Sequence, residues 1–195
     1  RFQPSLLTAL DLAEPMLARA RQRVAQVSPV QADLENPPLA DNSVDLAVSS
    51  LAVQWLDRPD AFINRLAQVL KPGGYLALST LGPKTLAELR QAWAQVDQAT
   101  HVNRFLPASD WQAAIAASSL TLTFWHEEQL EVRYDAPLNL VRELKALGAH
   151  HVERQHTPAV GHLRPMLRAY EEFICADGRY PATWDVFYLI ARKAL

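Results

Sequence analysis

Several features that define special classes of protein are missing from this chain. Its 195 residues include one cysteine, Cys175, which excludes an intrachain disulfide, disfavours a cysteine-based metal site and predicts a reducing, cytoplasmic compartment. No apolar run reaches the roughly 18 residues that a membrane helix requires, so we expect no contact with a membrane. The formal net charge of −2 lacks the excess of positive charge that is typical of nucleic-acid-binding chains.

Glycine is also scarce, with six residues in the chain and none before Gly73. The first residue is arginine, and the opening segment lacks the charged-then-apolar pattern of a secretion signal. We therefore expect that the chain begins inside a longer protein. Its 49% hydrophobic and 21% charged residues are typical of a globular protein.

Short apolar segments alternate with amphipathic ones over the first 82 residues. We expect strands at 5–12, 29–33, 44–50 and 75–81, and helices at 14–26 and 59–74. Strands that are apolar through most of their length are typical of a buried parallel sheet with helices on both faces. The sequence therefore predicts an α/β fold with a doubly wound, mostly parallel sheet.

The remaining sequence is richer in helices. We expect helices at 83–99, 108–119, 136–149 and 163–176, and strands at 120–134 and 183–194. The predicted organisation is a core domain at 1–82, a helical lid insertion at 83–119 and 135–180, and C-terminal strands of the core sheet at 120–134 and 181–195. The last of these is the expected antiparallel closing strand.

Two acidic residues end neighbouring strand segments, where open α/β sheets bind their ligands. Asp11 could accept hydrogen bonds from both hydroxyls of a ribose, and Asp33 could accept one from the amino group of an adenine. Apolar residues beside them could enclose the ring; these are Leu12, Met16 and Leu34. The alternative is that both aspartates cap turns or helix ends.

The stretches "LTALDLAEPMLARARQR", "VQADLENPPLADNSVDLAVSSLAVQWLDRP" and "LAQVLKPGGYLALSTL" resemble motifs of class I S-adenosylmethionine-dependent methyltransferases. The stretches "SSLAVQW", "LAELRQAWAQVDQATHVNRFLP", "LVRELKALGA" and "GRYPATWDVFYLIARK" resemble the malonyl-[acyl-carrier protein] O-methyltransferases of biotin synthesis, the BioC family. Together they span residues 5–194. The first strand and glycine-rich loop of that family have no counterpart here, so we expect them upstream of Arg1 or deleted.

The resemblance implies methyl transfer from S-adenosylmethionine to the free carboxylate of a malonyl thioester on acyl-carrier protein. Because a carboxylate is already an anion at neutral pH, no catalytic acid or base is implied. A cation must hold the carboxylate, and Arg104 is the expected residue, with Lys145 as second candidate. The alternatives are a surface ion pair for Arg104 and a solvated helix face for Lys145.

The resemblance also places the segment 49–55 beside the methyl donor. Ser49, Ser50 and Leu51 are expected to contact the cofactor, and Gln54 and Trp55 to contact the substrate, with Leu51 completing the wall between them. Trp55 could also favour a sulfonium through its ring face. The alternative is that Trp55 packs under the next helix.

A basic segment is the expected docking surface for the acidic carrier. Residues 142–168 contain five Lys or Arg (Arg142, Lys145, Arg154, Arg164 and Arg168) against two acids (Glu143 and Glu153). The alternative is an ordinary solvated face. The histidines of this segment (His150, His151, His156 and His162) match no zinc spacing, so no metal site is expected. We expect a monomer.

Three other functions stay open at this point. The chain could belong to a methyltransferase that acts on another small molecule, or to a nicotinamide-dependent dehydrogenase. It could also be a non-catalytic relative that keeps the fold without the glycine-rich loop.

Overall fold

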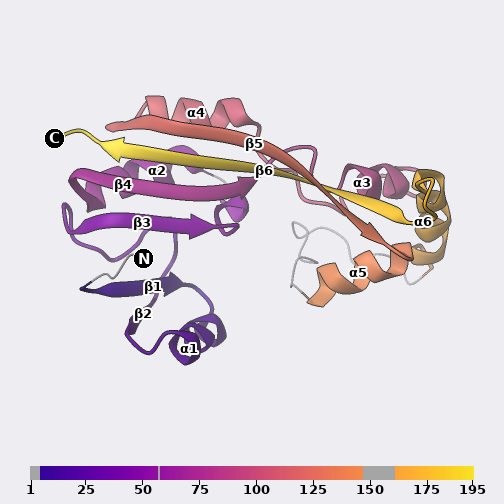
Figure 1. The fold of residues 1–195 in the computed structure, drawn as a ribbon, viewed down its shortest axis with the longest axis horizontal. Coiled ribbons are helices and arrows are strands. Elements are labelled where there is room, and N and C mark those ends of the chain that lie inside the picture. The colour runs from indigo at the N-terminus through magenta and orange to yellow at the C-terminus, as the bar shows by residue number, and fades with distance from the viewer. Residues whose placement is uncertain (1–4, 57, 147–160) are drawn as a thin grey trace. The chain divides into compact units, whose positions relative to one another are not determined.

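A computed structural model describes residues 5–56, 58–146 and 161–195, and Figure 1 shows its fold. The elements are β1 (Leu7–Asp11), α1 (Glu14–Arg23), β2 (Val27–Gln31), β3 (Val44–Ser50), η1 (Val53–Trp55), α2 (Pro59–Val69), β4 (Leu70–Leu81), α3 (Ala87–Ala94), α4 (Ala108–Ala116), β5 (Leu120–Tyr134), α5 (Pro137–Ala146), α6 (Leu163–Tyr170), η2 (Glu171–Phe173) and β6 (Tyr180–Lys193). The predicted α/β class is confirmed.

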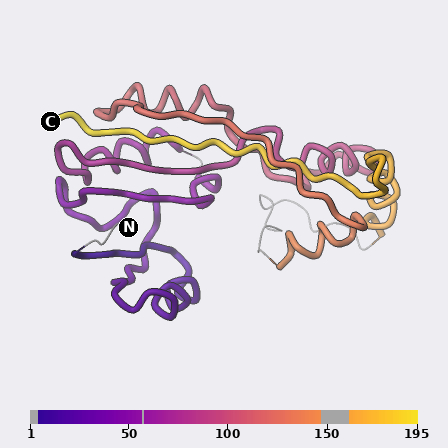
Figure 2. The backbone as a smooth tube through the Cα atoms, viewed as in Figure 1, coloured from indigo at the N-terminus to yellow at the C-terminus, as the bar shows by residue number. Residues whose placement is uncertain are grey.

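The chain divides into two compact units, and β5 and β6 contribute residues to both. Unit 1 comprises Arg1–Ser79, Ser109–Trp125 and Leu189–Leu195, and unit 2 comprises Thr80–Ala108 and His126–Tyr188. The backbone trace in Figure 2 shows β5 and β6 side by side, as their pairing requires. The predicted scheme of core, lid and closing strands stays a prediction.

Unit 1 begins with two parallel strand pairs. β1 pairs with β2 and places Asp11 opposite Gln31, and β3 pairs with β4 and places Ser50 opposite Ser79. Among the described residues, β1 and β2 form one sheet and the order β3-β4-β6-β5 forms another. The arrow of β6 points opposite to those of β3 and β5 in Figure 1. The larger sheet is therefore mixed, with parallel and antiparallel strands.

The predicted helix 59–74 is too long. α2 buries Phe62, Ile63 and Leu66, as its apolar spacing predicts, but it ends at Val69 and β4 begins at Leu70. Pro72 explains the early end, because it disfavours a helical conformation in the preceding residue and supplies no backbone N–H. The "LKPGG" segment therefore starts the strand rather than ending the helix.

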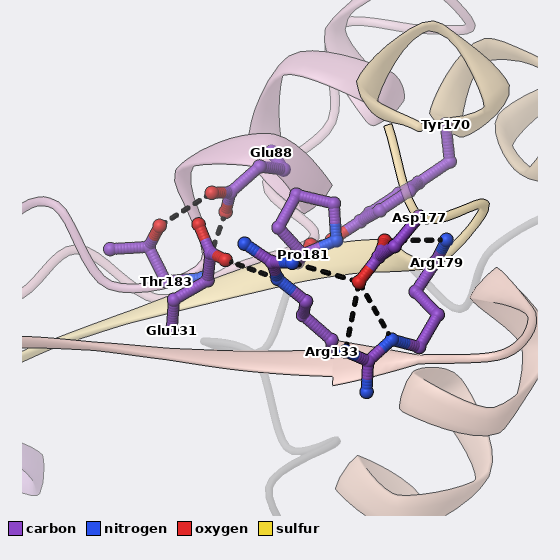
Figure 3. A network of polar contacts seen from close by, with 8 residues as sticks. All are labelled: Glu88, Glu131, Arg133, Tyr170, Asp177, Arg179, Pro181 and Thr183. Atoms are coloured by element: carbon purple, nitrogen blue, oxygen red, sulfur yellow. Dashed lines mark hydrogen bonds and ion pairs between the residues drawn. The ribbon is translucent and has the colours of Figure 1, made fainter. Parts of the chain in front are cut away.

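Unit 2 has its own core, in which α3, α5 and α6 contribute Trp93, Leu140, Met166 and Tyr170. The Tyr170 hydroxyl donates a hydrogen bond of 2.7 Å to the carbonyl of Pro181, and burial raises the pKa of Tyr170. This bond ties α6 to the first residues of β6 (Figure 3).

A group of ion pairs lies at the start of β6, and Figure 3 shows its members around one carboxylate. Asp177 accepts from Arg133 on β5 at 2.8 Å and from Arg179 at 2.8 Å. Arg133 also pairs with Glu131 at 2.6 Å. The two guanidinium groups hold the pKa of Asp177 below its usual range.

The first turn of α3 is fixed to β6 through Thr183. The Leu86 N–H donates to the Thr183 carbonyl at 2.7 Å, and Leu86 takes a left-handed conformation with φ of 54°. The Glu88 carboxylate accepts hydrogen bonds from both the N–H and the hydroxyl of Thr183 (Figure 3). These bonds set the position of the helix that carries Arg90.

Candidate functional site

A pocket of about 200 Å³ lies in unit 2, where α3 ends and the following segment turns back past it. Its lining includes Arg90, Trp93, Asp97, Thr100, His101 and Arg104. Arg104, the cation predicted from the sequence, is therefore a pocket residue. Its side chain is exposed, and within the described part of the chain no hydrogen bond or ion pair engages it. The predicted alternative of a surface ion pair finds no partner among those residues.

Lys145, the second candidate cation, lies elsewhere. It is an exposed residue in the last turn of α5 and does not line this pocket. The structure therefore does not bring the two predicted cations together. The pocket contains Arg90 instead, a residue that was not predicted from the sequence.

One wall of the pocket is an aspartate held by two histidines. Asp97 bonds His101 through Nε2 at 2.7 Å and His162 through Nδ1 at 2.8 Å, and the His101 ring stacks on Trp93 with centroids 3.6 Å apart. The histidine hydrogen bonds lower the pKa of Asp97 to about 2. Since His162 directly precedes α6, the cluster joins α6 to the segment after α3.

Replacing Asp97 by asparagine is expected to change how stability depends on pH. A carboxyl whose pKa is lower in the folded than in the unfolded chain stabilises the fold above its unfolded value, and this contribution is lost as pH falls through the folded value. For Asp97 that window runs from the ordinary aspartate pKa of 3.8 down to about 2. Urea unfolding between pH 5 and 2 should therefore show a shallower acid loss in Asp97→Asn than in wild type. Equal slopes would contradict this role.

The sequence contains a local signal for this pocket that was not predicted. Arg90, Trp93 and Asp97 are spaced by three and four residues, which would place them on one side of the helix predicted over 83–99, although α3 itself ends at Ala94. His101 follows at a further four. His162 lies 65 residues away from Asp97, so no local pattern indicates its contact. His150, His151, His156 and Arg154 lie outside the described residues.

The strand ends of unit 1 carry the two predicted aspartates. Asp11 ends β1 and accepts a hydrogen bond from the Ala13 N–H at 2.8 Å. Asp33 follows β2 and accepts one from the Glu35 N–H at 2.9 Å. Both bonds use the Oδ1 atom, so each aspartate caps a turn and keeps its Oδ2 oxygen for other donors.

Apolar side chains beside these carboxylates face outward. Leu12 is 68% exposed and Met16 is 50% exposed, whereas Leu34 is half-buried. Exposed large apolar side chains beside unused acceptors suit a flat, partly polar ligand. The predicted contact of these three residues with an adenine ring stays a prediction.

The segment after β3 has an unusual backbone. Leu51 is left-handed with φ of 49°, a conformation that is disfavoured for residues with a Cβ and that concentrates at functional sites. The Leu51 N–H donates to the Ser79 carbonyl at 3.0 Å, and its carbonyl accepts from the Gln54 amide at 2.7 Å. The Gln54 Oε1 atom is buried and has no hydrogen-bond partner among the described residues. It is an acceptor without a donor.

The side chains of this segment point to a surface rather than a core role for Trp55. Val53 is fully buried, while Leu51 is 45% and Trp55 50% exposed. The alternative that Trp55 packs under the following helix is therefore not supported. Ser50 accepts a hydrogen bond of 3.2 Å from the Ser79 hydroxyl, and Ser49 is half-buried.

Metal-ligating clusters and membrane-spanning helices are both absent from the described residues. Residues 5–56, 58–146 and 161–195 contain no group of three or more metal-ligating side chains suited to an ion. None of their helices has the length and apolar character to cross a bilayer.

Comparisons with known proteins identify the family of this chain. A methyltransferase domain model matches residues 2–78. The malonyl-[acyl-carrier protein] O-methyltransferase of Methylococcus capsulatus is 44% identical over 198 residues, covering 98% of this chain and 72% of that protein. The corresponding protein of Laribacter hongkongensis is 38% identical over 202 residues, covering 96% and 68%.

The chain is also similar to a longer relative and to solved structures of lower sequence identity. The bifunctional biotin biosynthesis protein BioHC of Teredinibacter turnerae is 37% identical over 96% of this chain, which spans 34% of that protein. The solved YcgJ protein of Bacillus subtilis has a TM-score of 0.64 at 18% identity, covering 97% of this chain and 83% of that one. An S-adenosylmethionine-dependent methyltransferase from Mesorhizobium loti has a TM-score of 0.55 at 21% identity, covering 97% and 81%. The fold is methyltransferase-like, and the chain belongs to the malonyl-[acyl-carrier protein] O-methyltransferase family.

Proposed function

We propose that this chain takes part in methyl transfer from S-adenosylmethionine to the free carboxylate of a malonyl thioester on acyl-carrier protein, a step of biotin synthesis. The observation that carries the proposal is the 44% identity to a malonyl-[acyl-carrier protein] O-methyltransferase over 98% of the chain. The pocket with Arg104 supports it independently, because an arginine without a partner among the described residues suits a carboxylate.

The residues of unit 1 fit the proposed cofactor. The unused Oδ2 atoms of Asp11 and Asp33 match the donors of a ribose and an adenine. Leu12 and Met16 supply exposed apolar surface for the ring. We assign cofactor contacts to these residues and to Leu34, Ser49, Ser50 and Leu51.

When bound, S-adenosylmethionine supplies an electrophilic methyl group. The chain itself needs no general base, since the substrate carboxylate is already ionised at neutral pH. Its residues would instead orient that carboxylate and exclude water. In this proposal Arg104 holds the carboxylate, and Gln54 and Trp55 contact the substrate. Lys145 is the second candidate for the cation that holds the carboxylate.

The finer architecture belongs to the same proposal. The two sheets of the described residues would form part of one doubly wound sheet, with residues 1–82 as its core and with 120–134 and 181–195 as its last strands. Residues 83–119 and 135–180 would form a helical lid over the substrate. We propose a cytoplasmic monomer.

The proposed docking surface for the acidic carrier is formed by exposed basic residues on α5 and α6. They are Arg142, Lys145, Arg164 and Arg168. The two helices contact each other, and Arg164 and Arg168 share one helix face because they are four residues apart. Such a surface would raise the rate of association with an acidic partner, and this increase would be smaller at high salt.

Reversing the charges of α6 tests this surface. Arg164→Glu/Arg168→Glu should lower kcat/KM for malonyl-acyl-carrier protein about 10-fold at low salt and leave malonyl-pantetheine almost unaffected, because that substrate lacks the carrier. Arg21→Glu/Arg23→Glu on α1 is the matched control and should leave both unchanged. An equal loss with both substrates would contradict carrier docking.

The activity itself is tested with the protein that contains this chain, malonyl-acyl-carrier protein and S-adenosylmethionine labelled in its methyl group. Label on the carrier-bound malonyl group supports the proposal. Label on other small acids but not on the carrier would replace it with a small-molecule methyltransferase. No label, together with no binding of S-adenosylmethionine by folded protein, would indicate a non-catalytic relative.

A further inference from the structure

Arg90 faces the same pocket as Arg104, and its position is fixed. It lies on α3, half-buried, and donates from Nη1 to the Pro83 carbonyl at 3.0 Å and from Nη2 to the Thr85 carbonyl at 3.1 Å. A guanidinium carries five N–H donors, so further donors remain. Because the start of α3 is itself bonded to β6 through Thr183, this cation is held before any ligand arrives.

Among the residues that the structure describes, no acid balances the charge of Arg90. In the described ranges it forms no ion pair, and burial together with repulsion from Arg104 lowers its pKa. Asp97 is the acidic residue among those that line the pocket, but its two oxygens bond His101 and His162. Two arginines therefore face one small pocket whose own carboxylate is already engaged.

We infer that Arg90 is a second substrate-binding residue, which together with Arg104 clamps the free carboxylate of the substrate and so distinguishes it from the methylated product. This inference rests on the proposed function. A carboxylate has two oxygens and about four lone-pair directions, so one donor from each of two arginines leaves directions free for bond formation. A pocket of about 200 Å³ has room for a carboxylate head but not for a whole thioester arm.

The chemistry of the step makes the clamp useful for turnover. A lone pair of the carboxylate oxygen forms the new O–CH₃ bond, the S–CH₃ bond breaks, and its electron pair stays on sulfur. The sulfonium becomes a neutral thioether and the carboxylate becomes a neutral ester, with no proton gained or lost. The anion that the two arginines hold has then disappeared, so the clamp should favour substrate over product.

The test compares two probes that differ by one methyl group, malonyl-pantetheine and its methyl ester. Their affinities are measured by titration calorimetry with S-adenosylhomocysteine present, so that no methyl group is transferred. Wild-type protein should bind the anion more tightly than the ester. Arg90→Gln should reduce this preference about 10-fold or more, with ester binding almost unchanged. Arg104→Gln should act in the same direction.

Two further variants separate substrate binding from support of the loop. Arg90→Lys keeps the charge without the planar fork and should recover part of the preference. Lys84→Gln removes an exposed charge from the same loop, outside the pocket lining, and should keep the wild-type preference. Thermal melting establishes that each variant is folded.

Two outcomes would overturn the inference. If Arg90→Gln weakens anion and ester equally, the residue only supports the loop; if it changes neither, it does not contact the substrate. Failure of the proposed function would look different, because wild-type protein would then transfer no methyl group to malonyl-acyl-carrier protein at all.

Discussion

Asp11→Asn is expected to weaken S-adenosylmethionine binding about 10- to 100-fold without a matching loss of stability. In the proposed site the Asp11 carboxylate accepts hydrogen bonds from the ribose hydroxyls. Hydrogen bonds to a charged group contribute about 1.5–3 kcal/mol each, and an amide offers one acceptor oxygen in place of two. The measurement is the dissociation constant from titration calorimetry with the protein that contains this chain.

Two substitutions of Asp11 distinguish a role in cofactor binding from a role in turn capping. The hydrogen bond from the Ala13 N–H to Asp11 Oδ1 at 2.8 Å can be kept by an asparagine oxygen, so Asp11→Asn preserves the cap and Asp11→Ala removes it. We therefore expect both variants to bind cofactor weakly and only the alanine variant to lower the urea midpoint by a measurable amount. Normal cofactor binding in Asp11→Asn would leave capping as the role of Asp11.

The features of unit 1 that were predictable are local in sequence. β3 begins and ends at the predicted residues, Val44 and Ser50, because an apolar run between polar loops is sufficient to define a strand. The aspartates could be selected because strand ends are recognisable and ligands bind there. The end of α2 was predicted wrongly. Gly73 and Gly74 are typical of residues that follow a helix, but Pro72 disfavours helical structure in the residues before it, and α2 ends at Val69.

Only one of the two arginines in the pocket of unit 2 could be predicted from the sequence, because the other depends on contacts that are distant in sequence. Arg104 stands out in a short polar segment between helices, but its partner in the pocket, Arg90, sits in an ordinary amphipathic helix. The position of that helix depends on hydrogen bonds that link Thr183 with Leu86 and Glu88, which are 95 or more residues away from Thr183 in sequence. Contacts of that range follow from tertiary packing, and no local periodicity encodes them.

Gly82→Ala is expected to be among the most destabilising substitutions in the chain, costing about 3 kcal/mol. A Cβ at this position would lie 2.4 Å from Asp185 Oδ2 and 2.4 Å from Phe187 Cζ. Both neighbouring side chains are buried. Such distances are far inside van der Waals contact, so atoms of β6 would have to move.

Hydrogen bonds prevent both the backbone at Gly82 and the Asp185 carboxylate from moving away to relieve the steric overlap. The Gly82 N–H donates to the Asp185 carbonyl at 2.7 Å, which holds the backbones together, and Asp185 Oδ2 accepts from the Lys84 N–H at 3.1 Å, which holds the carboxylate in place. Turning the carboxylate away would leave a buried charge without that donor. The substitution therefore either creates a steric overlap or breaks a buried hydrogen bond.

Urea unfolding of Gly82→Ala against Gly161→Ala measures this cost with the residue change held constant. A Cβ added at Gly161 would have no atom within 4 Å, so this substitution should shift stability by less than about 0.5 kcal/mol. Equal midpoints for the two variants would mean that β4 and β6 can separate near Gly82. In that case the bonds through Thr183 alone would have to position α3 and Arg90, and Thr183→Val should then reduce the preference of the pocket for the anionic probe.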